Sequence, residues 1–99
     1  MELNHSLGLA WFQNNVKARL HGDVIVRLRS FSDGDFGDLE EVELERDNLI
    51  AYINFWSRDM IGFGAVTSQG DSVVETEMIE VCVPADYDSI LRPLIKLFT

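Results

Sequence analysis

The stretch Leu49-Ile-Ala-Tyr-Ile-Asn-Phe-Trp-Ser57 decides the fold that we predict for this chain. Successive side chains of an extended strand point to opposite sides. The two resulting rows are Leu49, Ala51, Ile53, Phe55 and Ile50, Tyr52, Asn54, Trp56. Because both rows are largely apolar or aromatic, the stretch is typical of a central strand that is covered on one face and partly covered on the other.

Four further strand-like segments surround this central strand. Their alternation of apolar and polar residues predicts strands at 24–31, 39–45, 61–68 and 73–83, with the turn-rich stretch 32–38 between the first two. Met78-Ile79 interrupts the alternation and suggests a bulge or a buried crossing. All connections between the predicted strands are short, which favours an antiparallel meander over parallel crossovers.

Helical spacing is found at both ends of the chain. Leu9, Phe12, Val16 and Leu20 form one apolar stripe, with Ser6 as candidate N-cap and Gly22 as candidate terminator. The segment after Pro84 is also helical in pattern. We place its N-cap at Ser89, because Pro93 is best tolerated near the start of a helix.

These elements predict one α+β domain over residues 1–99. It is a five-stranded antiparallel meander sheet flanked by an N-terminal and a C-terminal helix, in the order α-β-β-β-β-β-α. The expected arrangement places both helices on one face of the sheet, and the alternative places one helix on each face.

The composition limits the classes of function. The 99 residues include 17 acidic and 8 basic residues, a net charge of −9, which repels nucleic acid and anionic lipid. No apolar run approaches the roughly 20 residues that span a bilayer. The N-terminus lacks the pattern of a signal peptide, and the single Cys82 suits a reducing compartment. We therefore expect a cytoplasmic protein that binds neither nucleic acid nor membrane.

No catalytic or metal-binding pattern stands out. His5 and His21 lie outside any known nucleophile motif, and Cys82 sits in an apolar segment as a small hydrophobic residue would. The acidic turn beginning at Asp33 resembles a calcium loop, but the twelfth position, which requires glutamate, is Leu44. We expect no enzyme activity, no cofactor and no metal.

Much of the negative charge lies in residues 33–47, which carry a local net charge of −7 with Arg46 as the only base in that stretch. Its acidic residues are Asp33, Asp35, Asp38, Glu40, Glu41, Glu43, Glu45 and Asp47. They are either a solvated edge that prevents sheet-to-sheet aggregation or a surface that attracts a basic partner. Tyr52 and Trp56 on the central strand are either interface anchors or core rings.

The hairpin Ile50-Ala-Tyr-Ile-Asn-Phe-Trp-Ser-Arg-Asp-Met-Ile-Gly-Phe-Gly64, in a short acidic α+β chain, resembles the small immunity proteins of bacterial toxin systems. These include the partners of contact-dependent growth-inhibition toxins. The resemblance implies a non-catalytic protein that binds and neutralises a cognate toxin domain, often a basic nuclease. The eight acidic residues of 33–47, together with Tyr52 and Trp56, are its candidate partner-binding residues. Because the net charge of −9 opposes self-association, we expect the chain to be monomeric or weakly dimeric alone. The alternative is a structural or adaptor module that self-associates, in which the acidity serves solubility only.

Overall fold

The computed structural model describes residues 5–34, 37–56, 60–80 and 85–99. In chain order, its elements are α1 (His5–Asn15), η1 (Lys17–Arg19), β1 (Ile25–Gly34), β2 (Gly37–Arg46), β3 (Leu49–Trp56), β4 (Met60–Thr67), β5 (Ser72–Glu80), α2 (Ala85–Ile95) and η2 (Lys96–Phe98). The predictions made at Asp35 and Cys82 lie outside the described residues.

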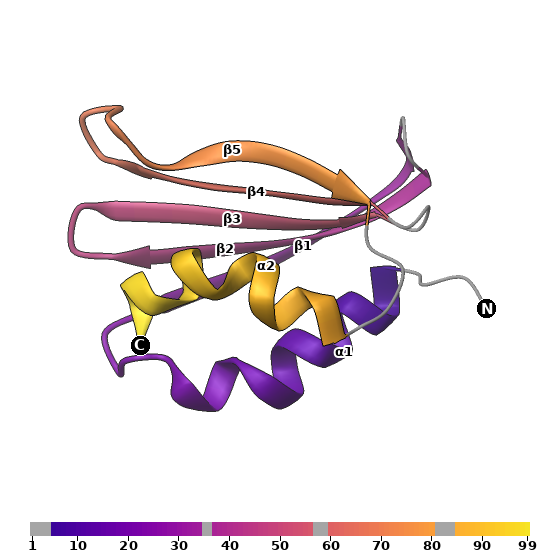
Figure 1. Cartoon of the computed structure of the whole chain (residues 1–99), viewed down its shortest axis with the longest axis horizontal. Helices are drawn as coiled ribbons and strands as arrows, with labels where there is room; N and C mark the ends of the chain where they lie inside the picture. The colour runs from indigo at the N-terminus through magenta and orange to yellow at the C-terminus, as the bar shows by residue number, and fades with distance from the viewer. Residues whose placement is uncertain (1–4, 35–36, 57–59, 81–84) are drawn as a thin grey trace.

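The five strands form one antiparallel sheet in the order β1-β2-β3-β4-β5. This confirms the predicted α+β meander, and Figure 1 shows the strands following one another across the sheet. The turns after β2 and β4 use left-handed backbone conformations at Asp47 (φ 55°) and Gly70 (φ 91°), which short polar residues and glycine tolerate best.

The first hairpin is longer than its composition suggests. We expected a loop over 32–38, but β1 runs to Gly34 and β2 starts at Gly37, so most of that stretch is strand. The register shifts between Phe31 and Gly34, and Gly34 then pairs with Gly37. Pairing across the hairpin overrides the local preference of Ser, Asp and Gly for turns.

Both helices lie on one face of the sheet, as expected (Figure 1). α1 packs on β2 and β3, and α2 packs on β4. The core between the layers is fully apolar and combines inward-facing strand residues with the helix stripes: Phe12, Val16, Val42, Leu44, Ala51, Ile53, Phe55, Ile61, Phe63, Ala65, Tyr87, Leu91, Leu94, Ile95 and Phe98.

Three aromatic rings join the helical layer to the sheet. The Tyr87 ring on α2 lies 5.3 Å from the Trp11 ring on α1 and 5.5 Å from the Phe55 ring on β3, measured between centroids. Tilted and edge-on ring pairs of this kind add about 0.5–1.5 kcal/mol beyond the burial of their area. Trp11, which lies off the main stripe of α1, therefore contacts the second helix.

The helix boundaries correct two predictions. α1 begins at His5, before Ser6, and ends at Asn15, after which Lys17–Arg19 form a separate 3₁₀ turn well before Gly22. α2 begins at Ala85, so Ser89 is not its N-cap, and Pro93 lies inside the helix. A start at Ser89 would still include Leu91, so the buried residue that the earlier start adds to the helix is Tyr87. Burying a large apolar side chain stabilises a fold by about 1.5–3 kcal/mol, which offsets much of a proline cost of about 3 kcal/mol.

Candidate functional site

The sheet face turned away from the helices, which we call the open face, carries five of the ten candidate residues. Strand register places its side chains in four rows. These are Ile25–Glu45–Ile50–Val66, Arg27–Glu43–Tyr52–Gly64, Arg29–Glu41–Asn54–Gly62–Met78 and Phe31–Leu39–Trp56. The structure thus brings Glu41, Glu43, Glu45, Tyr52 and Trp56 together on one surface.

The glutamates of β2 are paired with arginines of β1. Arg27 Nη1 donates to Glu43 Oε2 at 2.9 Å and to Glu45 Oε1 at 3.1 Å, and Arg29 Nη1 donates to Glu41 Oε1 at 3.4 Å. Hydrogen bonds to Glu45 and Glu43 raise the pKa of Arg27. Counting charges within residues 33–47 missed these arginines, because they lie in the preceding strand. The three glutamates are not a bare row of negative charge.

The other acidic candidates do not share this surface. Glu40 lies on the helix-side face, where its Oε2 accepts a hydrogen bond of 2.6 Å from Ser30 Oγ, and strand alternation places Asp38 on that side too. Asp47 is in the turn between β2 and β3, and Asp33 is near the end of β1. The acidic stretch is therefore divided between two faces and a turn.

The row Phe31–Leu39–Trp56, which we call the apolar row, lies at the end of the open face that is next to the β1–β2 hairpin. Phe31 is 50% exposed, Leu39 is buried and Trp56 is half-buried. Tyr52 is also half-buried. The two rings proposed as anchors are thus outside the helix-side core, with part of each ring accessible.

Asn54 is a polar residue of the open face that sequence reasoning did not single out. Its Oδ1 is buried and has no hydrogen-bond partner among the described residues. A buried acceptor left without a donor costs about 1–3 kcal/mol. The signal in the sequence was a lone amide between Tyr52 and Trp56 in an otherwise apolar strand.

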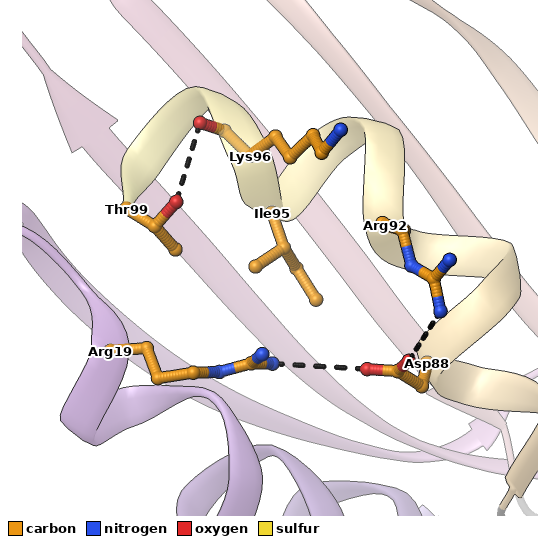
Figure 2. A pocket seen from close by; sticks show the side chains of 6 residues that line it. All are labelled: Arg19, Asp88, Arg92, Ile95, Lys96 and Thr99. Atoms are coloured by element: carbon orange, nitrogen blue, oxygen red, sulfur yellow. Dashed lines mark hydrogen bonds and ion pairs between the residues drawn. The ribbon is translucent and has the colours of Figure 1, made fainter.

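A cavity of about 300 Å³ lies on the helical side, far from these rows in the fold. Its lining residues are Arg19, Asp88, Arg92, Ile95, Lys96 and Thr99 (Figure 2). Asp88 Oδ2 accepts a 2.8 Å hydrogen bond from Arg92 Nη2, and its Oδ1 lies 3.8 Å from Arg19 Nη2. These contacts lower the pKa of Asp88, Arg92 being the larger cause, so the carboxylate stays ionised and joins η1 to α2.

Within the described part of the chain, no three His, Cys, Asp or Glu side chains are grouped so as to hold a metal ion. No described helix has the length and apolar character needed to cross a membrane. Comparison of the sequence and fold with family models, curated proteins and solved structures finds no match.

Proposed function

We propose that this chain is a non-catalytic binding protein of the immunity type, which holds a basic toxin domain against the open face of its sheet. The observation that carries the proposal is the one-sided architecture. Both helices cover one face of the sheet (Figure 1), and Tyr52, Trp56 and Phe31 lie on the other face. Resemblance to small acidic immunity proteins supplies the class of partner.

The composition of the open face suits protein recognition. The apolar row supplies one half-exposed and one half-buried aromatic ring, and Arg27 and Arg29 with their glutamate partners border it. Interfaces commonly surround a few aromatic anchors with a polar rim, and Trp, Tyr and Arg dominate their binding energy.

The pairing of the glutamates changes how charge acts in this proposal. Arg27 and Arg29 partly neutralise Glu41, Glu43 and Glu45. These glutamates are therefore not an unpaired row of negative charge that would by itself attract a basic partner. The attraction of a basic domain then arises from the net charge of −9 spread over the whole molecule. Such attraction raises the association rate and weakens as salt increases.

The test begins with co-purification of the intact chain at low salt from its native cell, followed by reconstitution of the complex from purified components. The bound protein should be a basic domain whose toxicity this chain suppresses on co-expression. Trp56→Ala should weaken binding by about 30- to 1,000-fold, mainly through faster dissociation, as expected for a central aromatic anchor. The control is Leu28→Ala, which removes a 46% exposed residue on the opposite face of the sheet and should leave affinity unchanged.

A melting curve for each variant separates binding from folding. A Trp56→Ala protein that melts like the parent and binds the domain with unchanged affinity would contradict the proposed face. Sedimentation showing a tight dimer of the isolated chain, with no heterologous partner recovered, would favour the self-associating adaptor instead.

A further inference from the structure

β1 is an edge strand of the sheet. It runs for ten residues from Ile25 to Gly34, and β2 is its only neighbour in the sheet of described strands. The helical layer is centred elsewhere, because α1 packs on β2 and β3 and α2 packs on β4. The outer side of such a strand presents backbone donors and acceptors that another strand can pair with.

Exposed apolar side chains are concentrated on this edge strand. Ile25 is 49% exposed, Leu28 is 46% exposed and Phe31 is 50% exposed, and these are three of the five large hydrophobic residues exposed in the described part of the chain. Ile25 and Phe31 lie on the open face, whereas Leu28 lies on the helix-side face. A strand added beside β1 would cover apolar surface on both of its faces.

The two arginines of β1 are only partly used within the chain. Arg27 makes both of its side-chain hydrogen bonds through Nη1, and Arg29 makes its single one through Nη1, all toward β2. Their side chains are 43% and 53% exposed. No acceptor in the described residues bonds the Nη2 or Nε donors of either guanidinium. A guanidinium can pair with two carboxylates from different sides, because its five donors are spread around a plane.

We propose that the outer edge of β1 is a docking site for an extended partner strand in which carboxylate residues face Arg27 and Arg29. Flanking apolar residues of that strand would face Ile25, Leu28 and Phe31. Main-chain hydrogen bonds to the sheet edge would provide affinity, and the alternation of acidic and apolar side chains would provide specificity. The occupant is a segment of another protein, and it shares Ile25, Arg27, Arg29 and Phe31 with the open face.

Charge argues against a second copy of β1 as the occupant. Antiparallel pairing of two such strands about Leu28 would set Arg27 of one copy opposite Arg29 of the other, and like charges directly opposite destabilise a sheet. β2 shows which sequence does fit: Leu39, Glu41, Glu43 and Glu45 stand opposite Phe31, Arg29, Arg27 and Ile25. Residues 38–46, Asp-Leu-Glu-Glu-Val-Glu-Leu-Glu-Arg, are therefore a ready probe of the chemistry that the outer edge accepts.

The experiment titrates a capped synthetic peptide of sequence 38–46 into the intact ¹⁵N-labelled protein at about 0.15 M NaCl, where the repulsion between the acidic peptide and the net charge of −9 is screened beyond about 8 Å. Amide shifts should be largest in β1. A peptide carrying Glu41→Lys and Glu43→Lys should bind at least about tenfold more weakly, since two charge-assisted contacts become repulsive. A peptide that exchanges with β2 would shift β3 amides as strongly as β1 amides, and this result would overturn the proposal.

Two matched protein variants locate the contact. Leu28→Ser removes the apolar side chain from the helix-side face of β1, away from the open face, and should reduce peptide affinity several-fold. Val73→Ser makes the same kind of change at a 43% exposed residue of β5, the opposite edge strand, and should leave affinity unchanged. Absence of β1 shifts at millimolar peptide would show that Arg27 and Arg29 only protect this edge from pairing. Equal binding of the two peptides would show that the edge does not select carboxylates, and this result too would overturn the proposal.

Discussion

At the scale of single residues, Asp88 links α2 to η1. Its carboxylate accepts a hydrogen bond from Arg92 of the same helix and pairs with Arg19 of η1, a turn nearly seventy positions earlier in the chain (Figure 2). Its side chain is 48% exposed, so solvent screens the interaction. The contact is therefore a modest tie between α2 and the end of the first helical segment.

Asp88→Asn should reduce the free energy of unfolding at pH 7, and this difference should disappear in acid. The arginines lower the pKa of Asp88 from its ordinary value of 3.8 in the folded protein. A lowered folded-state pKa contributes stability that is fully present above 3.8 and is lost as pH falls through the folded value. Urea unfolding at pH 7, 5 and 3 measures the effect.

The control for this prediction is Asp86→Asn. Asp86 is also in the first turn of α2, but its carboxylate makes no ion pair within the described residues. Its substitution should show a smaller loss at pH 7 than Asp88→Asn. A difference between Asp88→Asn and the parent that persists unchanged at pH 3 would mean that packing, and not the charge of Asp88, is responsible.

The candidate site shows which residue-level properties a sequence can reveal. Alternation placed Tyr52 and Trp56 together on the strand face opposite Ala51 and Phe55, and the structure has them on the open face. The partners of Glu41, Glu43 and Glu45 could not be read from local charge. They depend on the register of β1 against β2, which brings together residues 12 to 18 positions apart.

At the scale of elements, α2 shows tertiary packing overriding a local signal. Pro93 predicted a late helix start, yet the helix begins at Ala85 and continues through the proline. Tyr87, which a start at Ser89 would leave outside the helix, is buried. Its burial favours the earlier start. The strands were better predicted, because alternating patterns report directly on a two-sided sheet.

Pro93→Ala should stabilise the protein by about 2–2.6 kcal/mol. Proline inside a helix lacks the amide that would donate to the carbonyl four residues earlier and costs about 3 kcal/mol relative to alanine, while its rigidity in the unfolded chain returns about 0.4–1 kcal/mol. Pro93 is exposed, so its replacement leaves no cavity. Thermal and urea unfolding monitored by circular dichroism measure the change.

The matched variant for Pro93 is Arg92→Ala at the neighbouring position, which keeps the proline and removes the contact to Asp88. It should destabilise the protein slightly. If Pro93→Ala destabilises the protein, the backbone conformation that proline imposes is needed to pack Leu94 and Ile95 in the core.

At the scale of the whole molecule, the charge is large for the size of the protein. A net charge of −9 on 99 residues adds repulsion to the compact state, whereas the ion pairs of Arg27, Arg29 and Asp88 oppose that repulsion locally. Exposed ion pairs of this kind contribute about 0–1 kcal/mol each. The repulsion involves many more charges than the pairs do, so its screening should dominate the response of the protein to salt.

The free energy of unfolding should therefore rise as NaCl is increased from 0.01 M to 0.3 M, because the screening length falls from about 30 Å to less than 10 Å. Urea titrations across that range measure the effect; NaCl is preferred to sulfate, which stabilises proteins by exclusion from their surface. The double variant Asp47→Asn, Asp71→Asn removes two turn carboxylates that form no ion pair within the described residues. Asparagine also tolerates the left-handed backbone conformation of position 47. This variant should be more stable than the parent at low salt and should gain less from added NaCl. If the parent protein instead loses stability as NaCl rises, the arginine–glutamate ion pairs of the open face outweigh the net repulsion. The net negative charge would then not measurably reduce the free energy of unfolding.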